Sequence, residues 1–503
     1  MTTTTAVSTT VELVYINGTR RAGAAGEEHS IINPASGKEI ARGSLATLDD
    51  VEEAVAAARA AFPGWSTTSP AERSEIMLRW ADILESRAEE LASLESNNGG
   101  KPIKLATGFD IPGVIDNVRF FAAAARNLEG KASAEYSPDH TSSIRREAIG
   151  VIGSIAPWNY PLQMAAWKVL PAVAAGNTIV FKPAELTPLT SVIFAETASE
   201  AGMPDGVFNV VTGKGRTVGD AIINHSEVNM VSFTGSTNVG KAIGAIATGQ
   251  LKKVHLELGG KAPFVVFDDA DIEAAARGAV AGNLINAGQD CTSATRAYVH
   301  RSKFDEFVNR VKELMEQVTI GAVEDENTDL GSLISVGHRD SVAAMVDRAR
   351  EAGATIVTGG RIPEHAPEGS SYYEPTLIID AAQDSEIVQD EVFGPVLVAL
   401  PFDTDDEAIQ LANDTPFGLA ASAWTTNIYR GQRASREIQA GCVWINDHIP
   451  IISEMPHGGY KASGFGKDMS QYSLDEYTNV KHVISEIEPT AHKEWHDLIF
   501  IAE

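Results

Sequence analysis

A cysteine in polar surroundings is the strongest chemical feature of this sequence. Cys291 is one of only two cysteines in 503 residues, and it lies in the run NAGQDCT at residues 286–292. A structural cysteine behaves as a small hydrophobe and prefers apolar neighbours. A thiol flanked by glycine, amide and hydroxyl side chains is instead placed where a substrate could reach it, although most cysteines in polar loops are inert. Cys291 is therefore a candidate nucleophile.

A glutamate earlier in the chain could act as the matching base. The run at residues 254–258 alternates like a strand, with its apolar residues on one face and Glu257 on the other face together with His255. Gly259 and Gly260 follow, and their missing side chains would permit close approach by a substrate. A lone glutamate at a strand end is more often a surface charge. Together with Cys291, however, Glu257 offers a nucleophile and a base that could activate water.

Alternating strand-like and helix-like segments must position these groups. Between residues 149 and 260 the pattern predicts strands at 150–156, 177–182, 207–211, 230–234 and 254–258, with helices at 162–175, 190–201, 218–224 and 239–247. A second alternating block runs from Lys261 to about Val443 and includes a predicted helix at 272–287. Such alternation builds a parallel sheet covered on both faces, with ligands bound at the carboxyl ends of its strands.

Polar residues follow three more of these strands. Asn159 lies between two aromatic residues, and Lys182 and Glu185 follow the next strand. Gly235 and Ser236 open a helix whose first N–H groups and dipole would bind a phosphate. That turn is not the usual G-x-G-x-x-G fingerprint, so by itself it could be a plain strand–helix turn.

Five separated motifs, taken together and in order, resemble the NAD(P)-dependent aldehyde dehydrogenase superfamily. They are PWN at 157–159, KPAE at 182–185, FTGS at 233–236, ELGGK at 257–261 with Cys291 after it, and EVFGP at 391–395. The resemblance implies an α/β fold with a Rossmann-like NAD-binding domain, a second α/β catalytic domain and a small β oligomerisation arm. The implied boundaries are 1–130 and 150–256 for the NAD-binding domain, with a C-terminal return at about 456–480, then 257–455 for the catalytic domain, and 131–149 and 481–503 for the arm and tail.

The resemblance also implies a mechanism. Cys291 as a thiolate would attack the aldehyde to form a thiohemiacetal, and the amide of Asn159 with the backbone N–H of Cys291 would hold the oxyanion. Hydride transfer to the nicotinamide would leave a thioester, and Glu257 would activate the water that releases the acid. Lys168 and Asp468 resemble a proton relay of the family. The usual partner is glutamate, so the shorter Asp468 puts that role in doubt, and Lys168 could instead be a helix-surface lysine.

NAD is the cofactor that the resemblance favours. Lys182 and Glu185 resemble the residues that hold the adenosine ribose, and a carboxylate there would repel the 2′-phosphate of NADP. Ser236 would contact the pyrophosphate, Glu391 the nicotinamide ribose and Phe393 the ring. The remaining cofactor residues implied by the resemblance are Trp158, Gly215, Phe233 and Gly235. Core packing is the alternative explanation for Trp158 and Phe393.

A cationic aldehyde is the expected substrate. Residues 453–461 (SEMPHGGYK) and 286–292 are most similar to bacterial 4-aminobutyraldehyde dehydrogenases, and betaine aldehyde dehydrogenases are close relatives. Tyr160 and Trp167 match aromatic residues of the amine pocket in that group, where cation–π attraction is worth about 0.5–2 kcal/mol. Asp110 matches a carboxylate that contacts the amino end, and Glu454 could accept a hydrogen bond from it.

Two departures favour a primary amine over a quaternary one. Pro112 stands where plant members have a further acid, and His457 stands where betaine-preferring enzymes place a tryptophan. Loss of an aromatic wall weakens a quaternary-ammonium site more than a primary-amine site, which can still form hydrogen bonds. The sequence therefore predicts oxidation of 4-aminobutyraldehyde to 4-aminobutyrate in putrescine degradation, with a betaine aldehyde or broad-range aminoaldehyde dehydrogenase as the alternative. A non-catalytic protein of the same fold would not need Cys291, Glu257 and Asn159 together.

Composition narrows the partners and the location. With 68 acidic and 40 basic residues the net charge is −28, which disfavours nucleic acid. No apolar stretch approaches the roughly 20 residues that cross a bilayer.

The two distant cysteines fit a reducing cytoplasm, and no cysteine or histidine spacing predicts a metal site. The first ten residues carry no secretory signal and predict a short disordered tail. A hairpin at 131–146 and a strand after Val480 leave sheet edges that another subunit could cover by pairing with them. A homotetramer, a dimer of dimers, is the expected assembly, and a dimer is the alternative that the sequence leaves open.

Overall fold

The structure is a computed structural model that describes residues 9–24, 27–128, 130, 132–489 and 492–500. Its largest sheet has eight strands. In spatial order they are β20 (Gly464–Phe465), β12 (Lys253–Glu257), β11 (Val228–Thr234), β8 (Val151–Ile155), β9 (Thr178–Lys182), β10 (Phe208–Val211), β2 (Val14–Ile16) and β3 (Thr19–Arg21). The strands from β12 to β10 run parallel, and β20 and β2 pair antiparallel at either side.

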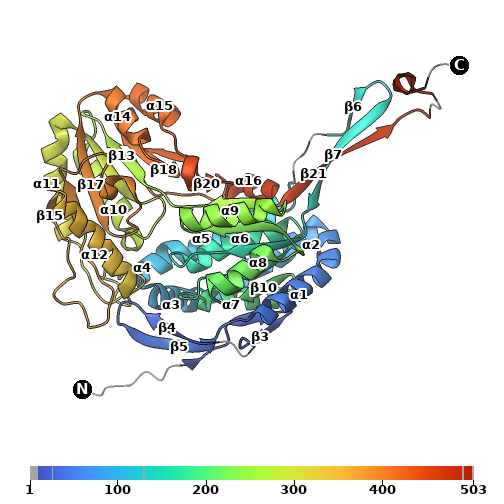
Figure 1. Cartoon of the computed structure of the whole chain (residues 1–503), viewed down its shortest axis with the longest axis horizontal. Helices are drawn as coiled ribbons and strands as arrows, with labels where there is room; N and C mark the ends of the chain where they lie inside the picture. Colours follow the sequence, from blue (N-terminus) through green and yellow to red (C-terminus); the bar gives the residue numbers. More distant parts are fainter. Residues whose placement is uncertain (1–8, 25–26, 129, 131, 490–491, 501–503) are drawn as a thin grey trace.

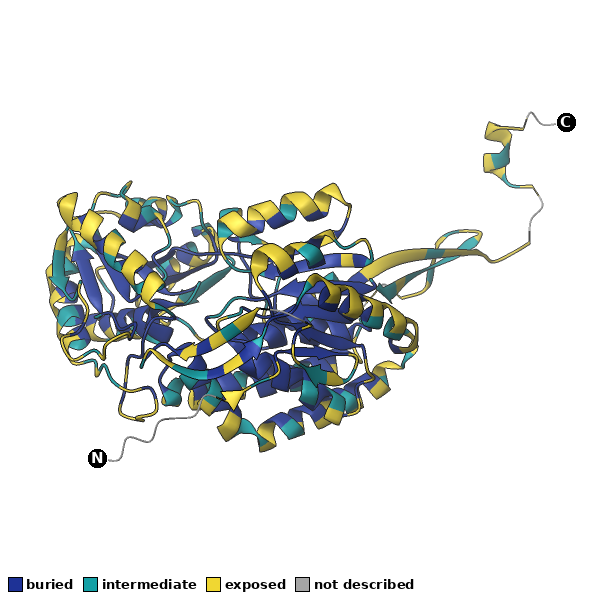
Figure 2. Ribbon diagram, turned by 60° about the horizontal axis from the view of Figure 1, so that its bottom comes forward, coloured by how far each residue is buried: buried dark blue, intermediate teal, exposed yellow. Residues whose placement is uncertain are grey.

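This sheet is covered on both faces, because alternate strand residues enter two separate cores. Ile152, Ile179 and Phe181 pack in one core with α2 (Pro70–Ser86), α5 (Ile111–Ala124), α6 (Pro161–Ala174) and α7 (Leu189–Glu200). Val151 and Val180 enter the other core with α1 (Leu48–Thr67), α8 (Asp220–Asn224) and α9 (Thr237–Gly249). Burial on both faces explains why the central strands β8, β9 and β10 are mostly apolar. Figure 2 shows the strands of the two large sheets buried and the outer helix faces exposed.

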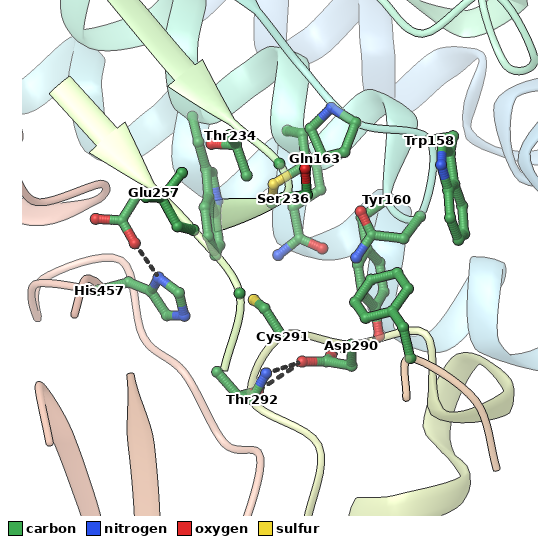
Figure 3. A pocket seen from close by; sticks show the side chains of 18 of the residues that line it. Trp158, Tyr160, Gln163, Thr234, Ser236, Glu257, Asp290, Cys291, Thr292 and His457 are labelled. Atoms are coloured by element: carbon green, nitrogen blue, oxygen red, sulfur yellow. Dashed lines mark hydrogen bonds and ion pairs between the residues drawn. The ribbon is translucent and has the colours of Figure 1, made fainter. Parts of the chain in front are cut away.

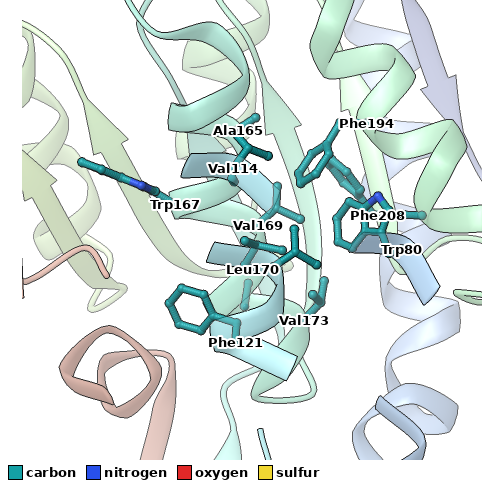
Figure 4. Packing of buried hydrophobic residues seen from close by; sticks show 14 of the residues in the cluster. Trp80, Val114, Phe121, Ala165, Trp167, Val169, Leu170, Val173, Phe194 and Phe208 are labelled. Atoms are coloured by element: carbon teal, nitrogen blue, oxygen red, sulfur yellow. The ribbon is translucent and has the colours of Figure 1, made fainter. Parts of the chain in front are cut away.

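The first core has an aromatic centre beside α6. The rings of Trp80 and Phe194 lie 4.2 Å apart, and Phe208 packs 5.8 Å from Phe194. In Figure 4, Val169 of α6 points toward these rings, whereas Trp167 points away from the other labelled side chains. Helix α6 therefore packs into this core through Val169, while Trp167 of the same helix points away from the aromatic centre.

The second large sheet has seven strands. In spatial order they are β15 (Thr355–Thr358), β16 (Thr376–Ile379), β17 (Val396–Phe402), β14 (Ala294–His300), β13 (Ala262–Val266), β18 (Ala420–Trp424) and β19 (Cys442–Ile445). All neighbours pair in parallel except β15 with β16. Its helices are α10 (Ile272–Leu284), α11 (Phe304–Glu316), α12 (Val336–Glu351), α14 (Asp405–Asn413) and α15 (Ile428–Glu437). Figure 1 shows the two sheets with their helices as neighbouring bodies.

A three-stranded arm extends away from both bodies (Figure 1). It consists of β6 (Ala134–Ser137), β7 (His140–Ala148) and β21 (Thr478–Glu486), and β21 pairs along the whole of β7. The short helix α16 (Ser470–Glu476) leads into β21 from the first body. A small sheet of β1 (Thr9–Thr10), β5 (Lys38–Ser44) and β4 (Glu28–Asn33) lies near the N-terminus, and α3 (Ala88–Gly99) contacts β4.

The predicted α/β fold is confirmed. The five strands predicted between 149 and 260 all occur, with ends that differ by at most two residues. The helix predicted at 272–287 is wrong at its end, because α10 stops at Leu284. Residues 1–8 of the predicted tail lie outside the described residues, and Thr9 and Thr10 form a strand paired with β5. Among the described residues no helix is long and apolar enough to cross a membrane.

Candidate active site

A cavity of about 290 Å³ lies between the two large sheets. The first sheet reaches it through residues that follow the carboxyl ends of β8, β11 and β12, as parallel sheets usually do. The second sheet contributes the loops before β14 and β17. Figure 3 shows Glu257, Cys291 and Asp290 around this space. Its predicted lining residues are Trp158, Asn159, Tyr160, Trp167, Gly235, Ser236, Glu257, Cys291, Glu391, Phe393 and His457.

The loop that carries Cys291 has an unusual backbone. After α10 ends, Asn286 and Ala287 have φ values of 49° and 56°, in the left-handed region that costs a side-chain-bearing residue free energy. At Gly288 a Cβ would lie 2.1 Å from the carbonyl oxygen of Gly394. This strained path ends the helical pattern and turns the chain so that Cys291 faces the cavity.

Asn159 ties this loop to the first sheet. Its Nδ2 donates to the carbonyl oxygen of Gln289 at 3.0 Å, and its own carbonyl accepts from Nδ2 of Asn286 at 2.8 Å. The side chain of Gln289 spans the loop, since its Nε2 donates to Asn286 and its Oε1 accepts from the backbone of Ile334. The hydrogen bond to Gln289 uses one of the two hydrogens of Asn159 Nδ2.

The two glycines after Glu257 make room for protein groups. A Cβ at Gly259 would lie 2.4 Å from Oε2 of Glu391, and a Cβ at Gly260 would lie 2.1 Å from the carbonyl oxygen of Cys291. The N–H of Gly260 also donates to Oε1 of Glu391 at 2.9 Å. Gly259 also lines the cavity, whereas Gly260 does not, so the expectation of close approach by a substrate needs correction for Gly260, which packs against the loop of Cys291.

Negative neighbours surround the thiol. Burial raises the pKa of Cys291 well above its ordinary value, and the carboxylates of Asp290, Glu391 and Glu257 raise it further. Burial likewise raises the pKa of Glu391 to about 7. A thiolate is therefore disfavoured in this arrangement until a positive charge enters the cavity.

Glu257 is nearly sealed from solvent. Its side chain is 4% exposed, and Nδ1 of His457 lies 3.8 Å from Oε2. Burial raises the pKa of Glu257 well above its usual range, Asp468 adds to this effect, and Lys168 and Lys467 oppose it. The raised pKa favours the protonated carboxyl, and only the ionised form can act as a base.

Lys168 and Asp468 form an ion pair behind Glu257. The lysine Nζ lies 2.7 Å from Oδ2, and both side chains are fully buried. The alternative of a helix-surface lysine is therefore wrong, because Lys168 lies on the inner face of α6. Neither residue lines the cavity, so the pair can act only through Glu257 or its neighbours.

Residues predicted to hold the cofactor fall into two groups. Ser236 is the N-cap residue of α9 and makes no side-chain capping bond, so the first N–H groups of that helix remain available. Trp158 and Phe393 pack at 5.4 Å, and Phe393 has a φ of 55° while its carbonyl meets Nε2 of His338 at 2.7 Å. Ser236, Gly235, Trp158, Glu391 and Phe393 line the cavity.

The other group lies outside that cavity. Nζ of Lys182 lies 3.4 Å from Oε2 of Glu185, and burial lowers the pKa of the lysine. Phe233 is buried in the second core, where a Cβ at Gly235 would lie 2.6 Å from its ring, so Gly235 is the residue that fits there. Gly215 is exposed at the start of a π-helical turn.

The residues predicted to bind the substrate separate in the same way. Tyr160, Trp167 and His457 line the cavity, and the rings of Trp167 and His457 lie 4.9 Å apart. Asp110 is fully buried and pairs with Nζ of Lys101 at 2.5 Å, and Glu454 is exposed. Neither carboxylate lines the cavity, because one is bound by Lys101 and the other faces solvent.

Asp290 is a functional candidate that the sequence did not single out. It lines the cavity, its Oδ2 accepts from the hydroxyl of Tyr160 at 2.8 Å, and its Oδ1 accepts from the N–H and hydroxyl of Thr292 at 2.7 and 2.6 Å. Within the described ranges these donors are neutral, and no lysine or arginine forms an ion pair with it. In the sequence, its position directly before Cys291 was the signal that could have identified Asp290 as a candidate.

Comparisons with known proteins agree with this architecture. The model of the aldehyde dehydrogenase family matches residues 21–483. A betaine aldehyde dehydrogenase of Bacillus subtilis (strain 168) is 42% identical over 465 residues, which cover 92% of this chain and 95% of that protein. The NAD⁺ complex of an aldehyde dehydrogenase from Bacillus cereus has a TM-score of 0.93 at 39% identity and covers 95% of this chain and 97% of its own.

A third relative has a different named substrate. A variant of the indole-3-acetaldehyde dehydrogenase AldA of Pseudomonas syringae has a TM-score of 0.92 at 40% identity, over 95% of this chain and 97% of its own. This chain belongs to the aldehyde dehydrogenase family. The predicted class, an NAD-dependent aldehyde dehydrogenase, is confirmed.

Proposed function

We propose that the protein oxidises 4-aminobutyraldehyde to 4-aminobutyrate with NAD, as a step of putrescine degradation. The observation that carries the proposal is Asp290, a carboxylate on the cavity wall held only by neutral donors among the described residues. Tyr160 and Trp167 line the same cavity and offer aromatic faces to a cation. An ammonium group would gain a charge-assisted hydrogen bond to Asp290 while the aldehyde end reaches Cys291.

The chain's own residues support each step. Cys291 attacks the aldehyde carbon, and Asn159 donates its second amide hydrogen to the oxygen as negative charge develops. Loss of hydride leaves a thioester on Cys291. Glu257 in its ionised form then takes a proton from the water that cleaves the thioester.

NAD supplies the hydride acceptor when it is bound. The residues present fit it, since the open N-terminus of α9 at Ser236 suits a pyrophosphate and Glu185 beside Lys182 suits a ribose with free hydroxyls. Trp158 and Phe393 give flat surfaces for the nicotinamide ring. The positive charge of the bound nicotinamide would lower the pKa of Cys291. Burial and the neighbouring carboxylates raise that pKa when the nicotinamide is absent.

Betaine aldehyde is the second candidate substrate. The Bacillus subtilis relative carries that name at 42% identity. His457 takes one wall of the cavity beside Trp167, so the aromatic surface is less complete than a trimethylammonium group would require. A primary ammonium can donate hydrogen bonds to Asp290, and a trimethylammonium cannot.

A panel of four aldehydes tests the proposal. NADH formation is measured with 4-aminobutyraldehyde, betaine aldehyde, butanal and succinate semialdehyde, each with NAD and with NADP. We expect the highest kcat/KM for 4-aminobutyraldehyde with NAD, and the lowest for the anionic succinate semialdehyde. A clear preference for betaine aldehyde would establish the second candidate instead.

The proposed setting is a homotetramer in the reducing cytoplasm. The β7–β21 arm carries exposed Val480 and Ile484, which a second copy of the chain could cover. Cys291 and Cys442 are both free thiols, as a reducing compartment would maintain. Light scattering on the purified protein would test the assembly, and a monomeric mass would contradict it.

A further inference from the structure

A buried histidine outside the cavity, His255, lies between Glu257 and a partly exposed carboxylate, and its ring nitrogens make no hydrogen bond to a described residue. β12 places His255 and Glu257 on the same strand face, and neither ring nitrogen of His255 reaches solvent. Nε2 of His255 lies 3.9 Å from Oε1 of Glu257 and 3.4 Å from Oδ1 of Asp468. On the other side of the ring, Nδ1 lies 2.9 Å from Oε2 of Glu476.

Glu476 is the member of this cluster of Glu257, Asp468, His255 and Glu476 that has the largest contact with solvent. Its side chain is 29% exposed, whereas His255 and Asp468 are fully buried and Glu257 is 4% exposed. The Lys168–Asp468 pair therefore has no direct contact with solvent of its own. A proton on Asp468 must therefore pass through another group to reach solvent, and among the described residues His255 is a titratable side chain that lies between Asp468 and the partly exposed Glu476.

Two glycines leave the space in which these side chains approach one another. A Cβ at Gly466, whose φ is +101°, would lie 2.9 Å from Nδ1 of His255 and 2.9 Å from Oε2 of Glu476. A Cβ at Gly458, whose φ is +154°, would lie 2.4 Å from Oε1 of Glu257. Both positions combine a left-handed backbone with a close approach, so the chain leaves room for His255 to contact both carboxylates.

We propose that His255 and Glu476 form the proton exit of the enzyme, and that they carry the proton of Glu257 to solvent during hydrolysis of the thioester. The proposal rests on the function proposed above. In that step the oxygen of water bonds to the acyl carbon, the carbon–sulfur bond breaks, and its electron pair returns to Sγ of Cys291. One water proton moves to Glu257, then through Asp468 or directly to Nε2 of His255.

The ring completes the transfer from its other side. Nδ1 of His255 releases a proton to Glu476, which passes it to bulk water, and the acid product ionises separately. The titratable groups that face His255 are Glu257 on its own strand, Asp468 before α16, and Glu476 on α16. Lys168 of α6 meets this cluster through Asp468, and the Tyr477 ring lies 6.3 Å from the histidine ring.

Stopped-flow and steady-state kinetics of three variants test this exit. The variants are His255→Asn, Glu476→Gln and the matched control Asp475→Asn, which removes a carboxylate that is 31% exposed on the same helix and lies 3.3 Å from Arg146. With NAD and butanal we expect a full first-turnover burst of NADH in all three. Steady-state kcat should fall at least tenfold in the first two and stay within twofold of the parent in the control.

Buffer rescue separates proton transfer from a packing role. In Glu476→Gln and His255→Asn, kcat should rise with imidazole concentration, and the pH profile should shift, because a soluble base replaces the missing path. Unchanged kcat in both variants, a loss of the burst together with kcat, or a loss that imidazole does not relieve would overturn the inference. If the parent protein reduces no NAD with any aldehyde, the proposed function itself fails.

Discussion

The hydroxyl of Tyr160 donates a hydrogen bond to Oδ2 of Asp290 at 2.8 Å and so joins the aromatic wall of the cavity to the residue that precedes Cys291. The carboxylate is thereby fixed in place while its charge stays unpaired by any described cation. One side chain can thus attract a cationic substrate and, at the same time, disfavour the thiolate of Cys291.

Replacing Asp290 by Asn should discriminate between charged and neutral aldehydes. A hydrogen bond to a charged group contributes about 1.5–3 kcal/mol, so the KM for 4-aminobutyraldehyde should rise by about 10- to 100-fold. Butanal serves as the control substrate, and its KM should change little. Equal changes for both aldehydes would mean that Asp290 does not bind the amine.

The same variant should make the free thiol more reactive. Asp290 raises the pKa of Cys291, so removal of its charge lowers that pKa and increases the thiolate fraction at a given pH. Without cofactor, iodoacetamide should alkylate the parent slowly at pH 7 and faster as the pH rises, and Asp290→Asn should show the same rise at lower pH. A curve that does not move would exclude Asp290 as the source of the effect.

Asp110 should contribute to stability rather than to substrate binding. Its ion pair with Lys101 is fully buried, and removal of one partner from such a pair typically costs about 3–5 kcal/mol. Lys101→Met should therefore lower the denaturation midpoint strongly, and the double variant Lys101→Met/Asp110→Asn should recover part of the loss. A raised KM for 4-aminobutyraldehyde with unchanged stability in Asp110→Asn would contradict this role.

Gly260 should be important for activity because it packs against the loop that carries Cys291. A Cβ there would lie 2.1 Å from the carbonyl oxygen of Cys291, so Gly260→Ala must displace the loop and should lower kcat by about 100-fold, as misplacement by about 1 Å can do. Gly113→Ala on α5 is the control, since nothing lies within 4 Å of its added carbon. The control should keep its activity and gain about 0.5–1 kcal/mol of stability.

Regular elements were predictable because their apolar periodicity is local. The strands β8, β9 and β10 are buried on both faces, and their largely apolar runs carry that information directly in the sequence. The end of α10 was not predictable, because residues 285–287 keep helical composition while long-range contacts force Asn286 and Ala287 into the left-handed region. Tertiary context overrides local preference there.

The site residues were predictable where family motifs lie at strand ends. They were less predictable where an ion pair with another residue determines what a side chain can bind. Asn159, Glu257 and Cys291 reach one cavity, as their motifs indicated. Asp110 could not be judged from sequence, since its partner Lys101 becomes its neighbour only after α3 ends and the chain turns back. Likewise, the link from His255 to Glu476 joins residues that are distant in sequence, and only the strand-face alternation hinted at it.

The most direct test of the account is covalent trapping on Cys291. Glu257→Gln is mixed with NAD and butanal, whose thioester lacks an amine that could cleave it, and the protein is then digested and analysed by mass spectrometry. We predict one NADH per active site and a butanoyl group on the peptide that contains Cys291. One equivalent of NADH without that adduct, or steady turnover by Cys291→Ala, would contradict the central claim.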